Sequence, residues 1–268
     1  MDPLRFSALL RTQRFGRPVE VFERLESTNL TAAERARAGA PEGSAVIALE
    51  QSGGRGRRGR SWISPPGAGL YVSFVLRPTI PPAQASLLTI AAGVALASAA
   101  AELCPGAGLR TKWPNDLLAE GGPEHRKKLG GILMELSARP GQIEHAIVGI
   151  GLNLGIAPLP PEVLRRATSL EAHGAQRPSV ELAFAHLAEA LERWMDALQD
   201  GPGPVGRLLA AYAERAAGLG EQVELGLEDG AISGVLRGFD AQGGLRIEVG
   251  GQERVFFAGD LWLPGMPR

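Results

Sequence analysis

The segment Gly54–Arg60 holds four arginines and three glycines, which concentrates cations on a flexible backbone. Glycines let the backbone approach a ligand and turn its N–H groups inward, and arginines offer paired planar donors to a phosphate or a carboxylate. No Gly-Lys-Ser or Gly-Lys-Thr follows, so the segment is not a Walker loop. It has the chemistry of a loop that grips an anion and becomes ordered once the anion arrives. Taken alone, however, such a run is more often a solvated basic loop or a nonspecific nucleic-acid contact.

A second group of reactive side chains lies in Lys112-Trp113-Pro114-Asn115-Asp116. A cation, an amide and a carboxylate occur within five residues at the expected end of a strand, where functional sites are commonly built. The Asp116 carboxylate could accept a hydrogen bond from an amine or help to hold Mg²⁺. The alternative is an ordinary strand end, with Trp113 in the core and a Pro-Asn-Asp turn after it.

The third group is Lys127-Lys128-Leu129-Gly130-Gly131. A lysine at the start of a strand is usually a surface group. Two glycines within three residues, however, indicate that a ligand or another backbone segment approaches closely. A lysine that points into a pocket beside the arginine loop would attract a carboxylate.

Two further motifs are weaker. Ser27-Thr28-Asn29 consists of residue types that are favoured at helix N-termini, so Asn29 or Thr31 could cap a helix, and Thr31-Ala32-Ala33-Glu34 has the spacing of a capping box. Gly149-Ile150-Gly151-Leu152-Asn153 contains Gly-x-Gly, but neither the Gly-x-x-Gly continuation nor a following helix supports dinucleotide binding.

The elements that must position these motifs can be predicted from hydrophobic periodicity. Strands are expected at residues 19–25, 45–50, 70–76, 109–113, 117–119, 129–136 and 146–154, the last interrupted by Gly149 and Gly151. Helices are expected from Ser27 to near Gly39, over the alanine-rich stretch 83–101, and at 180–198 and 205–217. The arginine-glycine segment itself is expected to have no regular structure.

From residue 220 onward the sequence pattern changes. Four short strand-like runs at 222–227, 231–239, 245–249 and 254–257 alternate with glycine-rich turns. This pattern is typical of a small antiparallel barrel. We therefore expect a larger domain over residues 1–219 and a small one over residues 220–268.

The composition excludes several classes of protein. The 268 residues carry a formal net charge of −1, which does not favour nucleic-acid binding along a broad surface. Cys104 is the only cysteine, so no intramolecular disulfide forms, and the four histidines are scattered without a zinc-binding pattern.

The N-terminus lacks the apolar core of a signal peptide. The uncharged stretch 83–101 is mostly alanine and includes Ser86, Thr89 and Ser98, which favours a buried core helix over a membrane span. The cytoplasm is the expected location.

Taken together and in order, these motifs resemble those of the biotin protein ligases. The resemblance covers roughly residues 20–265, and the arginine-glycine loop is specific when paired with Lys112–Asp116 at this distance. The matching segments are Ser27-Thr28-Asn29, Gln51 with Gly54–Arg60, Trp62, Lys112–Asp116, Lys128–Leu133 and Gly149–Asn153.

The resemblance implies an α+β fold, in which a mixed sheet with flanking helices, of the class II synthetase and biotin–lipoate ligase type, precedes a small SH3-like C-terminal barrel. It implies contacts to biotin from Ser27, Thr28, Asn29, Gln51, Arg55, Gly56, Arg57 and Lys128. It implies contacts to ATP or the adenylate from Arg57, Arg60, Trp62, Lys112, Asn115, Asp116 and Asn153. Catalytic roles are expected for Lys128, Arg57, Asp116 and Lys112. Lys128 rather than Lys127 is the match, because it directly precedes Leu129-Gly130-Gly131.

The implied reaction joins biotin to ATP as biotinyl-5′-AMP and then transfers biotin to a lysine of a carrier protein. The cations would neutralise the two reacting anions, the arginine loop would cover the intermediate, and Asp116 would orient or deprotonate the attacking amine. Mg²⁺ would accompany ATP, with Asp116 as a candidate ligand and no other metal site. The carrier would be a biotin carboxyl carrier protein or domain of acetyl-CoA carboxylase or another carboxylase. A homodimer is consistent with the family, whose members are often dimers.

Only 26 residues precede Ser27, too few for the N-terminal winged-helix domain of the family's repressors. We therefore expect the ligase-only class, without DNA binding. Three alternatives stay open at this point: a lipoate protein ligase, which the intact arginine loop disfavours; a nucleic-acid-binding module; and a biotin-binding protein without catalysis, which would not require Lys112, Asn115 and Asp116 beside the arginine loop.

Overall fold

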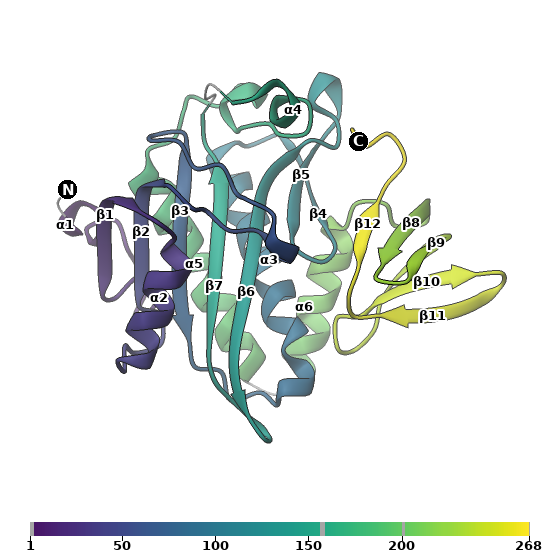
Figure 1. Ribbon diagram of the computed structural model, residues 1–268, viewed down its shortest axis with the longest axis horizontal. Helices are drawn as coiled ribbons and strands as arrows, with labels where there is room; N and C mark the ends of the chain where they lie inside the picture. Colours follow the sequence, from purple (N-terminus) through teal and green to yellow (C-terminus); the bar gives the residue numbers. More distant parts are fainter. Residues whose placement is uncertain (1–2, 156–158, 200–201, 268) are drawn as a thin grey trace.

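A seven-stranded mixed sheet forms the centre of the computed structural model, which describes residues 3–155, 159–199 and 202–267. The strand order is β1-β2-β3-β7-β6-β5-β4 (Figure 1). Strands β1 and β2 are parallel, and every other neighbouring pair is antiparallel. The strands are β1 (Val19–Leu25), β2 (Ala45–Gln51), β3 (Gly69–Leu76), β4 (Gly108–Lys112), β5 (Asp116–Glu120), β6 (Lys128–Arg139) and β7 (Gln142–Asn153).

Helices cover both faces of this sheet. Helix α2 (Thr28–Arg37) lies in front of it in Figure 1, and α3 (Ser86–Leu103), α5 (Val180–Gln199) and α6 (Pro202–Arg215) lie behind it. The alternation of side chains along a strand explains the two cores: Val72 and Phe74 of β3 pack on the side of α3, whereas Val75 packs with α2. Short helices complete the fold: α1 (Pro3–Ser7), η1 (Arg57–Gly59), η2 (Pro82–Gln84), η3 (Gly122–Glu124), α4 (Pro161–Leu164) and η4 (Glu171–His173).

Helix α3 is the alanine-rich element that the sequence predicts as a core helix. Within the described residues, the stretch Pro82–Leu103 is the one helix whose length and composition would allow it to cross a membrane. Its side chains from Leu87 to Ala97 are nearly all buried, however, and they join the main hydrophobic core. Small side chains let this helix pack closely against the sheet and α5, so its apolar character is explained by burial in the protein.

A second sheet of five antiparallel strands follows, as expected for a small SH3-like C-terminal unit. Its order is β11-β10-β9-β8-β12, and the strands are β8 (Gln222–Leu227), β9 (Gly230–Phe239), β10 (Leu245–Val249), β11 (Gln252–Phe256) and β12 (Asp260–Trp262). It packs against the first sheet's helices, where the Tyr212 and Phe239 ring centroids lie 4.9 Å apart. Trp113 Nε1 also donates to the Gly243 carbonyl oxygen at 3.1 Å. The domain boundary at residue 219 stays a prediction.

The structure corrects several local predictions. Strand β7 continues through Gly149 and Gly151, because both are paired in register with β6. Helix α2 already begins at Thr28, so Asn29 and Thr31 lie inside the helix and cap nothing; Ser27 occupies the N-cap position without a side-chain cap hydrogen bond. The arginine segment contains one 3₁₀ turn, η1, where no regular structure was expected.

Element boundaries also differ from the predictions. Strand β4 ends at Lys112 instead of Trp113. The sequence pattern missed α1 and β12, since elements of five and three residues are too short to show a hydrophobic period.

Candidate active site

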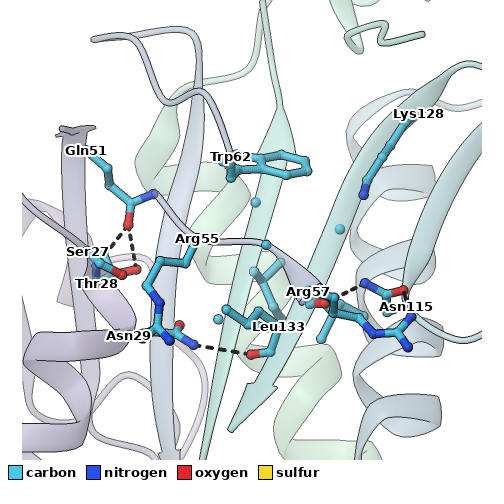
Figure 2. A pocket seen from close by; sticks show the side chains of 16 residues that line it. Ser27, Thr28, Asn29, Gln51, Arg55, Arg57, Trp62, Asn115, Lys128 and Leu133 are labelled. Carbon is cyan, nitrogen blue, oxygen red and sulfur yellow. Dashed lines mark hydrogen bonds between the residues drawn. The ribbon is translucent and has the colours of Figure 1, made fainter. Parts of the chain in front are cut away.

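The principal pocket lies on the α2 side of the large sheet, between the N-terminus of α2, the arginine segment and strands β6 and β7 (Figure 2). All eight residues that the resemblance assigns to biotin line it. They are Ser27, Thr28, Asn29, Gln51, Arg55, Gly56, Arg57 and Lys128. Residues from distant parts of the sequence therefore meet around one cavity.

Glycines in β6 and β7 form the floor of the pocket. A Cβ atom on Gly149 would overlap Asn29 Oδ1, and one on Gly151 would overlap the indole ring of Trp62. A side chain at Gly131 would likewise meet Lys128 Cε at 2.9 Å. These positions have no room for a Cβ, so glycine there lets functional side chains lie directly on the sheet.

A chain of hydrogen bonds fixes the polar end of the pocket. The Thr28 N–H and Oγ1 donate to Gln51 Oε1 at 2.8 and 3.2 Å, and Gln51 Nε2 donates to Ser64 Oγ at 2.8 Å. Ser73 Oγ, fully buried in β3, donates to Asn29 Oδ1 at 2.6 Å. Each amide thus has a defined orientation, and the pocket presents donors and acceptors in fixed places.

A second cavity, which we call the nucleotide cavity after the ligand that the resemblance implies, opens beside the first. Six of the seven residues assigned to ATP or the adenylate line it: Arg57, Arg60, Trp62, Lys112, Asn115 and Asp116. The two cavities share Arg57, Trp62, Asn115 and Lys128 among their lining residues. A ligand in one cavity would therefore lie next to a ligand in the other.

The seventh residue, Asn153, lies apart from the nucleotide cavity. Its amide donates to the Thr168 carbonyl oxygen at 2.9 Å. It lines an adjacent cavity together with Trp62, Lys128 and Leu159. The structure therefore places Asn153 near residues of the nucleotide cavity, but in a neighbouring and more apolar space.

Three charged residues form the centre of the nucleotide cavity. Asp116 lies 3.0 Å from Lys112 Nζ through Oδ2 and 2.6 Å from Lys128 Nζ through Oδ1. Burial by itself would raise the pKa of the Asp116 carboxyl, but the attraction and hydrogen bonding of the two lysines outweigh it and hold that pKa far below its usual value. Asp116 is consequently an anion whose task is to hold two ammonium groups.

Trp62 and Lys128 are stacked above the pocket floor. Lys128 Nζ lies 5.2 Å from the Trp62 ring centroid, within the range of a cation–π contact. The main chain of β6 also fixes Lys128, since its N–H donates to the Arg166 carbonyl oxygen and its own carbonyl accepts from the Thr168 N–H. Figure 2 shows both side chains on the same side of the pocket.

The arginine segment is fastened by its side chains. Arg57 Nη1 donates to Asn115 Oδ1 at 2.9 Å, and the Asn115 amide in turn donates to the Ile132 carbonyl oxygen at 2.8 Å. Burial lowers the pKa of the Arg57 guanidinium, although nearby Asp260 and Asp116 oppose this effect. Arg58 and Arg60 both pair with Asp260 at the start of β12, at 3.2 and 2.5 Å. The second sheet therefore holds this segment over the cavity.

The carboxylates near the nucleotide cavity do not form a resident metal site. Among the described residues, no group of three or more His, Cys, Asp or Glu side chains could hold a metal ion. Asp116, the predicted candidate ligand of Mg²⁺, has one lysine at each carboxylate oxygen, and Asp260 pairs with two arginines. This donor set does not suit a bound divalent cation, because the ion would have to displace ammonium or guanidinium groups.

Sequence reasoning missed three residues that shape the site: Ser73, Glu135 and Asp260. A buried serine inside the apolar run of β3 was the one readable signal, since a fully buried hydroxyl needs a partner. Glu135 and Asp260 carried no signal, because tertiary contacts bring them to the site: Glu135 contacts Arg55 and Asn29, and Asp260 pairs with Arg58 and Arg60.

Comparison with known proteins gives consistent matches. The profile of the Biotin/lipoate A/B protein ligase family matches residues 21–153. A biotin–[acetyl-CoA-carboxylase] ligase of Mycobacterium tuberculosis is 36% identical over 266 residues, which cover 94% of this chain and 93% of the relative. The bifunctional ligase/repressor BirA of Bacillus subtilis is 34% identical over 259 residues, covering 95% of this chain and 76% of the relative.

A solved structure shows the same relationship. The biotin protein ligase from Aquifex aeolicus in complex with biotin and ATP superimposes with a TM-score of 0.75 at 26% sequence identity, over 94% of this chain and 98% of that chain. The similarity therefore extends over both sheets.

Proposed function

This chain belongs to the biotin protein ligases of the biotin/lipoate A/B protein ligase family, and we propose that it activates biotin with ATP to biotinyl-5′-AMP and transfers the biotin to a lysine of a carrier protein. The single observation that carries this proposal is the pair of adjoining cavities that share Arg57 and Lys128. One cavity suits a small polar-headed acid and the other a nucleotide.

The first cavity suits biotin. Thr28, Asn29 and Gln51 present fixed polar atoms that can pair with the ring urea, whose N–H groups donate and whose oxygen accepts. At the other end, Arg57 and Lys128 offer positive charge to the carboxylate. Ile132, Leu133 and Ile150 also line this cavity and suit the apolar chain of biotin.

The chemistry follows from charge. In the first step a biotin carboxylate oxygen bonds to the α-phosphorus of ATP, and the bond to pyrophosphate breaks. Two anions must meet for this to happen, and preorganised cations reduce that barrier most effectively in a site that excludes water. Lys128 and Arg57 border both cavities, so they are placed to neutralise both reactants. Mg²⁺ would enter with ATP as part of the substrate.

In the second step the amine of the carrier lysine bonds to the carbonyl carbon, and AMP leaves. Asp116 was expected to orient or deprotonate this amine, and that role stays a prediction. Its two ion pairs favour a different contribution, in which Asp116 holds Lys112 and Lys128 in place. A carboxylate with a strongly lowered pKa is a weak base, so deprotonation by Asp116 is disfavoured.

We propose as carrier a biotin carboxyl carrier domain of acetyl-CoA carboxylase or another carboxylase, by analogy with the relatives named for that activity. We further propose a cytoplasmic location and a homodimer, which sedimentation of the purified protein with and without biotin and ATP would test. DNA binding is not expected from the charge of −1.

Biotin-dependent ATP–pyrophosphate exchange, followed by transfer of labelled biotin to a carrier domain, tests the proposed function. Exchange with biotin and none with lipoate is the expected result. Exchange with lipoate instead would identify a lipoate ligase, and biotin binding without exchange would identify a non-catalytic binder. Salt-sensitive binding of DNA or RNA without exchange would favour the nucleic-acid-binding alternative.

A further inference from the structure

Glu135 lies just outside the pocket but contacts two of its walls. It stands on β6 two residues after Leu133, and strand alternation therefore puts it on the same face as Leu133 and Gly131, which line the pocket. Its side chain is 34% exposed.

The first contact of Glu135 is with Asn29, at the polar end of the pocket. Asn29 Nδ2 donates to Glu135 Oε2 at 2.7 Å, and also lies 3.4 Å from the Leu133 carbonyl oxygen. Ser73 supplies the opposite partner by donating to Asn29 Oδ1. Both ends of the Asn29 amide therefore have a partner, which fixes the orientation of the amide. The bond to Glu135 is the stronger type, because its acceptor is charged.

The second contact is with the arginine segment. Arg55 Nη2 lies 3.0 Å from Glu135 Oε1, and Arg55 Nη1 donates to Glu135 Oε2 at 3.4 Å. Figure 2 shows the Arg55 side chain extending from its loop toward Asn29. One carboxylate therefore joins a residue at the polar end of the pocket to a residue of the segment that borders the pocket.

The remaining side-chain contacts of the arginine segment lie toward its other end. Arg58 and Arg60 pair with Asp260, and Arg57 donates to Asn115. The Arg55–Glu135 pair is consequently the ion pair that fastens the start of the segment to the large sheet, among the residues that the structure describes. A loop held at both ends loses less conformational entropy when it closes on a ligand.

We infer that Glu135 is a positioning residue for biotin: it orients the Asn29 amide and holds Arg55, so that the start of the arginine segment closes over a bound biotin. The inference rests on the proposed function and concerns the same site. Glu135 lines neither cavity. Its effect should appear in how tightly and how long biotin is held, rather than in the bond-forming steps.

The test compares Glu135→Gln with the wild-type protein. The amide can still accept from Asn29 but loses the ionic attraction to Arg55, so we expect biotin to dissociate about tenfold faster, with the KM for biotin rising more than kcat falls. Stopped-flow release of a fluorescent biotin analogue and pyrophosphate exchange measure these quantities. The matched control is Glu144→Gln. Glu144 is similarly exposed and pairs with Arg139 at the far end of β6 and β7, so this variant should change neither the release rate of biotin nor its KM.

A double-mutant cycle with Arg55→Ala separates positioning from a merely structural role. If Glu135 acts through Arg55, Glu135→Gln should add little to the faster biotin release of Arg55→Ala. Additive effects, or unchanged release from Glu135→Gln, would overturn the inference. Failure of the wild-type protein to bind biotin would instead refute the proposed function, so the two failures are distinguishable. An unchanged midpoint of thermal unfolding shows that each variant is folded.

Discussion

Lys112, Asp116 and Lys128 show how a small charge cluster can be both a structural and a chemical unit. Two ammonium groups and one carboxylate leave one net positive charge, and the carboxylate is largely buried. Lys112 is further held by the Leu261 carbonyl oxygen, which accepts from its Nζ at 3.1 Å. The positive charge is therefore fixed in place before any anion binds, as electrostatic catalysis requires.

We predict that Lys128→Ala lowers biotin-dependent pyrophosphate exchange about a hundredfold, because one preorganised charge is lost from the junction of the two cavities. The matched control is Lys127→Ala. Lys127 pairs with Glu124 at 3.2 Å, outside both cavities, and its variant should keep nearly normal exchange. Normal exchange by a folded Lys128→Ala protein would contradict the assigned role.

A second prediction concerns the pH dependence of stability. Asp116→Asn leaves two lysines without their buried partner, which should reduce the free energy of unfolding by about 3 kcal/mol at pH 7. Since folding lowers the pKa of the Asp116 carboxyl, its stabilising effect is complete above the pKa of the unfolded state, near about 4, and is lost as the pH falls further.

Urea unfolding at pH 7, 5, 4 and 3.5 checks this prediction. The difference in unfolding free energy between wild type and Asp116→Asn should be the same at pH 7 and 5 and smaller at pH 4 and 3.5. A difference that stays constant down to pH 3.5 would show that Asp116 does not titrate as the structure indicates.

At the scale of elements, the arginine segment is short and has little regular structure of its own. Its only regular turn is η1, in which Arg58 has a φ of 54°, in the left-handed region that non-glycine residues seldom adopt. Its shape therefore depends on contacts with the elements around it, through Arg55, Arg57, Arg58 and Arg60. Such a segment can exclude water from an intermediate and still open for exchange.

We predict that Arg57→Gly shortens the lifetime of enzyme-bound biotinyl-5′-AMP by roughly ten- to a hundredfold, as expected when hydrogen bonds from a charged group are lost. Arg58→Gly is the comparison: it removes one ion pair to Asp260, but glycine suits the left-handed backbone at this position and Arg58 lines neither cavity, so retention should fall less than in Arg57→Gly. Gel filtration of the loaded proteins over time measures retention. Equal leakage from both variants would mean that the cover depends on the loop's overall stiffness instead of on Arg57.

At the scale of the whole molecule, the nucleotide cavity is built by both sheets. Asp260, Leu261 and Trp262 of β12 line it together with Lys112 and Asp116 of the first sheet. Arg126, buried at the contact between the sheets, pairs with Glu221 at 2.5 Å and with Glu120 at 3.6 Å. The C-terminal sheet is thereby a wall of the proposed ATP site.

We predict that Asp260→Asn raises the KM for ATP about three- to tenfold, because Arg60, which lines the nucleotide cavity, loses the charge that holds it there. The KM for biotin should change less, since Asp260 does not line the first pocket. Asp229→Asn, in the exposed turn between β8 and β9, is the matched control in the same sheet. An equal KM for ATP in wild type and Asp260→Asn would show that the second sheet does not position the arginine segment.

Much of the fold could be predicted from the sequence. The alternation of apolar residues in strands and their helical spacing in helices both reflect which side chains are buried, and both can be seen in the sequence. The seven strands of the large sheet, three of the four long helices and four strands of the second sheet follow these patterns. The bounds of β1 and β8 are as expected, whereas β7 begins at Gln142 instead of residue 146 and β6 continues to Arg139 instead of residue 136. Helix α2 was expected too; its polar pattern does not show that Thr28 and Asn29 are buried beside a pocket, and only the family resemblance implied a ligand contact there. The identity of the family follows from motif order, which the comparisons confirm.

The sequence by itself determined which residue types can grip anions, and the resemblance assigned to biotin eight residues that the structure brings around one cavity. Only the tertiary structure decided how their charges are partnered. From its residue type, Asp116 could be a general base or a metal ligand. In the structure, both of its carboxylate oxygens form ion pairs with lysines. Glu135 and Asp260 lie 80 and 200 residues from the arginines they hold. Electrostatic effects depend on distance and burial in three dimensions, and neither is written in the spacing along the chain.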